Sequence, residues 1–83
     1  MKVRVKYFAS IREAFACSSE VVDTDVTTLA QLRDQLAARG GAAGESLARG
    51  RLVRAALNQV MSDESAALVD GCEVAFFPPV TGG

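Results

Sequence analysis

The residues most able to do chemistry in this 83-residue chain are its last six, Pro78-Pro79-Val80-Thr81-Gly82-Gly83. Two prolines stiffen the exit from the preceding apolar run, so we expect the tail to project from the domain. At about 3.3 Å per residue it would reach roughly 20 Å. Glycine has no Cβ, so Gly82 and Gly83 form the narrowest possible peptide. Such an end can enter a channel that side chains would block, and it presents a terminal carboxylate there.

A terminal carboxylate is inert until another group activates it. Transfer to the phosphate of AMP would make the Gly83 carboxylate a mixed anhydride, which a thiolate or persulfide can attack. The chain has no His, the commonest general base, and no phosphate-binding loop. We therefore expect a separate enzyme to use ATP for the activation, and we expect this chain to bind no cofactor itself. The alternative is that the Gly-Gly end arises by chance and is an ordinary frayed terminus.

The composition excludes several other classes of function. Nine Lys and Arg residues against ten Asp and Glu give a net charge of −1, which offers no basic excess for nucleic acid or an anionic membrane. No apolar run approaches the roughly 20 residues of a membrane span, and the first residues show no signal-peptide pattern. We expect a soluble, cytoplasmic protein with neither a nucleic-acid nor a membrane partner.

The two cysteines, Cys17 and Cys72, lie too far apart for a C-x-x-C redox pair or a four-ligand zinc set. A disulfide between them would suit a secreted mini-protein, but nothing else in the chain indicates secretion. We favour two small buried residues in a reducing compartment, and we expect no metal site. A chain this short also leaves little volume for a deep catalytic cavity.

The N-terminal part of the chain predicts two strands around a short helix. Residues 2–8 alternate in polarity, which is typical of a half-buried strand. The residues of the face expected to be buried are Val3, Val5 and Tyr7. The period then becomes helical over residues 9–16, with Ser10 and Glu13 at the spacing of a capping box. Residues 20–23 form a brief strand that we expect to pair with the first.

The clearest helix begins after Thr28, which forms a second capping-box pattern with Gln31. Its apolar stripe consists of Leu29, Leu32 and Leu36. We expect Gly40 and Gly41 to end this helix. The Gly-rich residues 40–51 lack the spacing of a phosphate-binding loop, so we predict a loop with one helical turn over residues 45–48.

Three strands are predicted in the C-terminal half, over residues 52–57, 60–61 and 72–77. Asn58 and Gln59 supply the turn between the first two, and Pro78 ends the last because proline cannot donate to a ladder. The fold class is therefore α+β, a roll in which one main helix covers one face of a mixed sheet. We expect residues 1–77 to form the domain and residues 78–83 to form a flexible tail.

Strand parity predicts a docking patch beside the tail. In the last strand the inward residues are Cys72, Val74 and Phe76, and the outward residues are Glu73, Ala75 and Phe77. If the first and last strands pair in parallel, Phe8 and Phe77 both reach the end from which the tail leaves. Two aromatic anchors there would concentrate binding energy, and Met61 either joins them or is an ordinary half-buried side chain. The outward cations are either steering charges for an acidic partner or a solvated face: Arg4, Lys6 and Arg54.

The chain resembles the family of small, sulfur-carrier subunits of molybdopterin synthase. The most specific motif is the C-terminal run Asp70-Gly71-Cys72-Glu73-Val74-Ala75-Phe76-Phe77-Pro78-Pro79-Val80-Thr81-Gly82-Gly83. Residues 5–13 and 55–59 also resemble that family, and the lengths match, so the likeness covers essentially the whole chain. Residues 40–51 show no family pattern.

The resemblance implies a β-grasp, ubiquitin-like fold. It implies that an E1-like adenylating enzyme activates Gly83 with ATP, and that a sulfurtransferase then supplies the sulfur of a thiocarboxylate. The tail would enter the active site of the large catalytic subunit and donate sulfur to cyclic pyranopterin monophosphate, which builds the dithiolene of molybdenum cofactor. The family complex is a heterotetramer with two copies of each subunit. The family's apolar contact residues correspond to Phe8, Met61 and Phe77, and its reactive end corresponds to Gly82 and Gly83. The resemblance also implies partner contacts for the residues that lead to this end, Pro78, Pro79, Val80 and Thr81.

Other functions share this chemistry. A sulfur carrier for thiamine synthesis, tRNA thiolation or cysteine synthesis would have the same fold and the same Gly-Gly end. A ubiquitin-like modifier would use the same activation to join Gly83 to a lysine of a target protein. A plain interaction module with an accidental Gly-Gly end is a further alternative.

Overall fold

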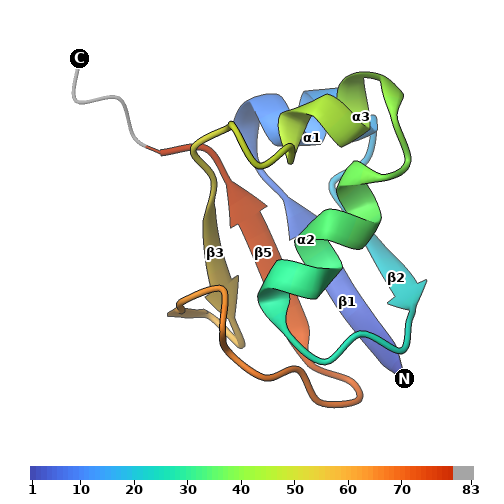
Figure 1. Cartoon of the computed structure of the whole chain (residues 1–83), viewed down its shortest axis with the longest axis vertical. Helices are drawn as coiled ribbons and strands as arrows, with labels where there is room; N and C mark the ends of the chain where they lie inside the picture. The colour runs from blue at the N-terminus through green and yellow to red at the C-terminus, as the bar shows by residue number, and fades with distance from the viewer. Residues whose placement is uncertain (80–83) are drawn as a thin grey trace.

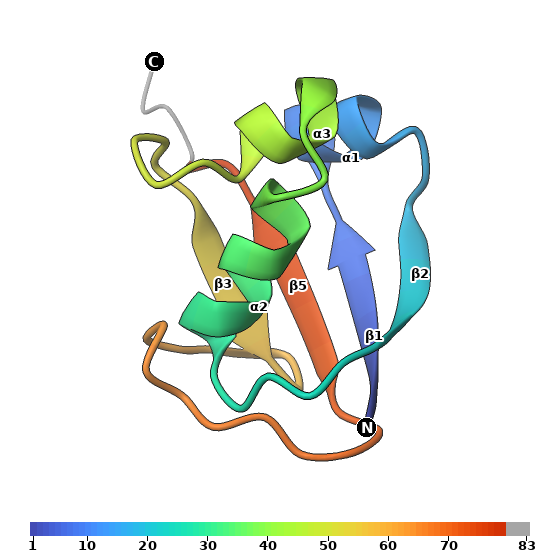
Figure 2. The same ribbon diagram turned by 45° about the vertical axis from the view of Figure 1, so that its right-hand side comes forward.

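The computed structural model describes residues 1–79 and shows a mixed β-sheet with its helices on one face (Figures 1 and 2). In chain order the elements are β1 (Lys2–Tyr7), α1 (Ala9–Phe15), β2 (Ser19–Asp23), α2 (Leu29–Ala37), α3 (Gly41–Ser46), β3 (Arg54–Leu57), β4 (Val60–Met61) and β5 (Glu73–Phe77). The sheet has the order β2-β1-β5-β3-β4. The predicted α+β roll is confirmed.

The first and last strands lie side by side in the middle of the sheet. β1 pairs in parallel with β5, which places Val5 opposite Val74, and antiparallel with β2 on its other side. β5 in turn pairs antiparallel with β3, and β3 pairs antiparallel with the short edge strand β4. The predicted parallel pairing of the first and last strands is confirmed: Tyr7, the last residue of β1, stands opposite Phe76, which precedes the last residue of β5.

The core lies between the sheet and α2, the helix that crosses it in Figure 2. Residues less than 2% exposed come from both layers: Val3, Val5, Tyr7, Leu29, Leu32, Leu36, Leu47, Val74 and Phe76. They include every residue of the predicted strand face and helix stripe. Burying one such side chain contributes about 1.5–3 kcal/mol.

The two predicted capping boxes have different outcomes. At α2 the box is formed, since the Gln31 N–H donates to Thr28 Oγ1 at 3.2 Å and the Thr28 N–H donates to Gln31 Oε1 at 3.3 Å. At α1 the prediction is wrong. The helix begins at Ala9 after an extended Phe8, whose carbonyl accepts the first helical hydrogen bonds, and no side chain caps it. Ser10 therefore lies inside the first turn instead of ahead of it.

In the segment between α2 and β3, the structure differs from three predictions. α2 ends at Ala37, before Gly40 and Gly41, and these two glycines have φ values of 72° and 64° that turn the chain into α3. Residues 41–46 are helical where we predicted a loop with a later turn. The third strand starts at Arg54, because residues 52–53 leave the sheet. Two strands outside this segment differ from the prediction by one residue at their first position. The strand predicted over residues 20–23 begins at Ser19, and the strand predicted over residues 72–77 begins at Glu73.

Arg33 on α2 holds this segment in place, although its polarity and helix position gave no indication of burial. It is 4% exposed. Its guanidinium donates to the carbonyl oxygens of Leu47, Ala48 and Arg51 at 2.8, 2.7 and 2.7 Å, and it pairs with Glu64 at 2.9 Å. The fork of five N–H donors serves three carbonyls and a carboxylate at once, which is more acceptors than the three donors of a lysine could serve. One side chain thus ties residues 47–51 to the helix.

A second polar network joins the edge strand β2 to the helices. The Tyr7 hydroxyl donates to Glu20 Oε2 at 2.7 Å, and Arg39 donates to both Glu20 oxygens at 2.8 and 3.0 Å. The hydrogen bonds from Arg39 lower the pKa of Glu20, and burial raises the pKa of Tyr7. The Tyr7 ring stacks on Phe15 with 4.0 Å between centroids.

Neither cysteine forms a disulfide. Cys72 is buried as predicted, but Cys17 is only half-buried, so the prediction of two buried cysteines is wrong for Cys17. Over residues 1–79, no three side chains of the metal-binding types gather into a site. None of the helices in that range combines the length and the apolar character of a membrane span.

Candidate functional site

The face of the sheet opposite the helices presents the predicted docking residues. Cys72, Val74 and Phe76 are buried under the helices, whereas Ala75 and Phe77 lie on the other face and are half-buried. The predicted parity of β5 is confirmed. This face is not covered by any helix of the described chain, as Figures 1 and 2 show.

Phe8 and Phe77 contact each other at the end of the sheet from which the tail leaves. Their rings meet edge to face, with 6.1 Å between centroids and an angle of 88°. Phe8 follows β1 directly, and its N–H donates to the carbonyl of Phe76 at 3.2 Å, which fixes it beside β5. It remains 46% exposed. Edge-to-face pairs of this kind are a preferred aromatic arrangement, so the two rings form one apolar surface.

Two alanines and a methionine extend this surface across the sheet. The strand register places Ala56 opposite both Ala75 and Met61. Met61 is 52% exposed, at the edge strand β4. We name the group Phe8, Ala56, Met61, Ala75 and Phe77 the apolar face patch. Sequence analysis did not single out Ala56 as a site residue, because only the pairing of β3 with both neighbouring strands places it on this face.

Charged residues lie around the apolar face patch. Arg54 is exposed and stands opposite Phe77 in the register of β3 and β5. Arg4 is exposed and stands opposite Glu73, whereas Lys6 forms an ion pair with Glu73 at 3.4 Å. All three cations predicted to point outward are therefore on this face.

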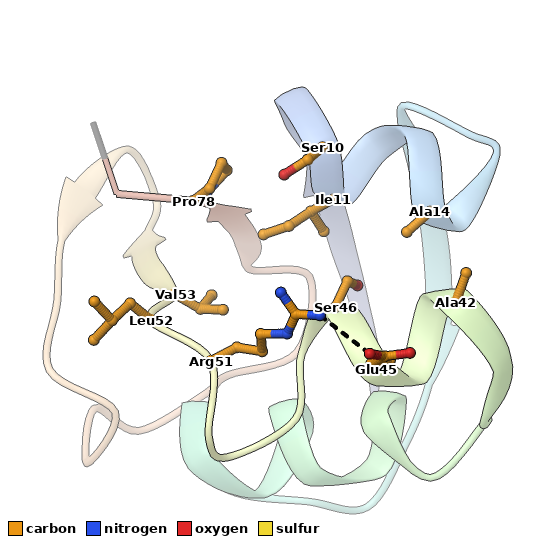
Figure 3. Close-up of a pocket in the computed structure, with 10 residues that line it drawn as sticks. All are labelled: Ser10, Ile11, Ala14, Ala42, Glu45, Ser46, Arg51, Leu52, Val53 and Pro78. Carbon is orange, nitrogen blue, oxygen red and sulfur yellow. Dashed lines mark hydrogen bonds and ion pairs between the residues drawn. The ribbon is translucent and has the colours of Figure 1, made fainter. Parts of the chain in front are cut away.

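The first residues of the tail, Pro78 and Pro79, are half-buried, and Pro78 borders a groove on the helix side (Figure 3). The groove has a volume of about 300 Å³ and runs between α1, α3 and residues 51–53. Arg51 and Glu45 form an ion pair across it at 3.1 Å. Two hydroxyls line the groove, those of Ser10 and Ser46, and the hydroxyl of Ser46 donates to the Ala43 carbonyl at 2.6 Å. Within residues 1–79, neither hydroxyl donates to a carboxylate, so neither forms the hydrogen bond of an activated nucleophile.

The remaining predicted tail residues, Val80, Thr81, Gly82 and Gly83, lie outside the described residues. Pro78 continues directly from Phe77, so the tail leaves the domain between the apolar face patch on one side and the groove on the other.

A mixed sheet of this order with its main helix across one face defines the β-grasp, or ubiquitin-like, class of domain. The chain matches the model of the ThiS family over residues 5–83, and it belongs to that family. It is 41% identical over 81 residues to the molybdopterin synthase sulfur carrier subunit of Escherichia coli (strain K12). The aligned residues cover 98% of this chain and 99% of the relative.

Two solved structures show the same fold over the full length of both chains. One is a subunit in the complex of subunits 1 and 2 of molybdopterin-converting factor from Helicobacter pylori 26695, at 28% identity and a TM-score of 0.69. The other is SAMP1 from Haloferax volcanii, at 25% identity and a TM-score of 0.77. Both comparisons cover 100% of this chain and 100% of the solved chain.

Proposed function

We propose that this chain is the sulfur carrier subunit of molybdopterin synthase. The observation that supports this most directly is the likeness over nearly the full length to sulfur carrier subunits of that enzyme, at 36–41% identity. The sequence motif of the tail and the apolar face patch beside it agree with the proposal. The domain supplies a docking surface and a carboxylate, and other proteins supply the catalysis.

The proposed chemistry takes place on the last carbonyl carbon of the chain. A carboxylate oxygen of Gly83 attacks the α-phosphorus of ATP, and pyrophosphate leaves. The terminal sulfur of a persulfide on a sulfurtransferase then attacks the carbonyl carbon, and AMP leaves. A thiol, acting as the two-electron reductant, cleaves the resulting S–S bond, which releases the thiocarboxylate and leaves a disulfide on the sulfur donor. We infer that an E1-like adenylating enzyme performs the first step, because the groove beside Pro78 contains no activated nucleophile and the chain has no His.

We propose that the large catalytic subunit covers the apolar face patch and receives the tail in its active site. There each thiocarboxylated chain donates one sulfur to cyclic pyranopterin monophosphate and returns to the carboxylate, so two such chains supply the two sulfurs of the dithiolene of the molybdenum cofactor. The patch contains two aromatic side chains and a methionine, residue types that are enriched in protein interfaces. We further propose a cytoplasmic heterotetramer with two copies of each subunit, and no cofactor on this chain.

The experiment is intact mass spectrometry of the protein isolated from its native host. A thiocarboxylate makes the chain heavier by the difference between sulfur and oxygen. Because oxidation of a methionine adds nearly the same mass, tandem spectra must locate the change at Gly83. A strain without the adenylating enzyme serves as the control and should yield only the carboxylate.

The same spectra separate the alternatives. Gly83 found in isopeptide linkage to lysines of other proteins would identify a modifier and contradict the carrier proposal. A thiocarboxylate that supports thiazole or cysteine synthesis in purified systems, but never molybdopterin formation, would place the carrier in another pathway.

A further inference from the structure

The cations of this chain differ between the two sides of the sheet. Of the five arginines that lie outside the strands, four form an ion pair within the described residues, at N–O distances of 2.7–3.1 Å: Arg33, Arg39, Arg49 and Arg51. The fifth, Arg12 on α1, forms none with any of the described residues. On the outer face, Lys6 alone forms one, and its distance is longer, at 3.4 Å. Within residues 1–79, Arg4 and Arg54 have no carboxylate within ion-pair distance.

The outer face is therefore positive in a chain that is slightly negative. By strand register it presents four cations, Lys2, Arg4, Lys6 and Arg54, against two carboxylates, Asp23 and Glu73. The whole chain has a net charge of −1. The excess of positive charge thus coincides with the face that no helix covers.

The two arginines stand on opposite sides of the apolar face patch. Arg54 lies opposite Phe77 on β3, at the tail end of the sheet. Arg4 lies on β1 opposite Glu73, and these two residues form the first pair between β1 and β5. The last pair, Tyr7 with Phe76, is at the tail end, so Arg4 lies toward the other end of the sheet. Glu73 forms its ion pair with Lys6 and not with Arg4. An interface formed over the apolar face patch would include both guanidinium groups at its margin.

We propose that the partner which covers the apolar face patch presents carboxylates to Arg4 and Arg54, so that this face selects an apolar partner surface with an acidic rim. The inference rests on the proposed function, because the partner meant is the large subunit of molybdopterin synthase. A guanidinium can donate two parallel hydrogen bonds to one carboxylate, and both groups can do so without breaking an internal ion pair. At an exposed rim, such charges act on the association rate more than on the dissociation rate.

The test measures association and dissociation rates with the purified large subunit from the same organism, at about 0.02 M and about 0.5 M salt. We expect Arg54→Ala and Arg4→Ala each to lower the association rate about threefold at low salt, and Arg54→Glu to lower it about tenfold. The differences should vanish at high salt, and the dissociation rates should change little. Arg51→Ala is the matched control, because it removes the same charge from the helix side.

Each outcome supports or overturns the inference. Association rates of the Arg4 and Arg54 variants that match the wild type, or an equal loss in Arg51→Ala, would show that this face does not select acidic groups. Wild-type binding that is tight but insensitive to salt would overturn the inference and leave the carrier function standing. Absence of any wild-type binding to the large subunit would overturn the proposed function, and the inference with it.

Discussion

The ring of Phe77 meets the ring of Phe8 edge to face, 6.1 Å between centroids, at the point where the chain leaves the sheet. One ring ends the last strand and the other follows the first strand, and the parallel pairing of β1 with β5 brings them together. The aromatic pair therefore stands at the base of the tail. A partner that holds the pair also holds the start of the tail at a defined position.

Removal of Phe77 should weaken docking without unfolding the domain. We expect Phe77→Ala to reduce the free energy of binding to the large subunit by about 1–4 kcal/mol, the range for an aromatic anchor in an interface. Calorimetric titration measures this free energy of binding. Val69→Ala is the control, since Val69 is 59% exposed in the segment before β5, at the end of the sheet away from Phe77, and should leave affinity unchanged. Equal affinities for wild type and Phe77→Ala would remove Phe77 from the interface.

Replacement of Arg33 should destabilise the domain strongly. Arg33→Met removes the donors to the carbonyls of Leu47, Ala48 and Arg51 and leaves Glu64 without this cation, so we expect a loss of about 2–4 kcal/mol in unfolding free energy. Urea denaturation measures this loss. Arg51→Met, at an exposed ion pair, should cost about 0.5 kcal/mol or less. If the two variants have similar midpoints of urea denaturation, Arg33 does not hold residues 47–51 in place.

Gly44 is required by a close approach of two helices. A Cβ at Gly44 would lie 2.4 Å from the carbonyl oxygen of Ala37, closer than any such contact can be. Gly44→Ala must therefore push α3 away from α2, and we expect a loss of about 1–3 kcal/mol in unfolding free energy. Gly50→Ala is the matched control, because a Cβ at Gly50 meets nothing within 4 Å. Thermal denaturation in which both variants behave alike would contradict the close packing.

The Glu20 network should make stability depend on pH in acid. Hydrogen bonds from Arg39 lower the pKa of Glu20 below its ordinary value of 4.5. A depressed folded-state pKa stabilises the fold above the unfolded-state value, and this contribution is lost as the pH falls through the folded-state value. Unfolding free energy should therefore decrease below about pH 4.5 in the wild type. Glu20→Gln should show a smaller decrease, and an identical pH profile would exclude Glu20 as a source.

Much of the fold could be predicted because local pattern and tertiary structure agree. The alternation of Val3, Val5 and Tyr7 and the stripe of Leu29, Leu32 and Leu36 all face one core. The predictions for residues 41–46 and 52–53 were wrong, and the segment between these two stretches is held by a distant side chain. Arg33 satisfies its carbonyls, and no local pattern indicates that a helix-borne arginine is buried there.

The part of the candidate site that depends on the alternation of side chains along each strand could be predicted. Phe8 and Phe77 could be placed together because alternation and a parallel pairing decide which way each faces. Ala56 could not, since its place beside Ala75 and Met61 depends on the registers of three strands. The difference between paired and unpaired arginines also required the structure, because ion pairs here join residues far apart in the chain.

The central claim is that the last carbonyl carbon of the chain delivers sulfur. It is tested most directly by a single-turnover reaction of the thiocarboxylated protein with the large subunit and cyclic pyranopterin monophosphate, with molybdopterin measured as the product. Wild type should form molybdopterin and lose sulfur from Gly83, whereas deletion of Gly83 or Gly82→Leu should abolish product while the domain stays folded and still binds the large subunit. Full product formation by either tail variant would contradict the account.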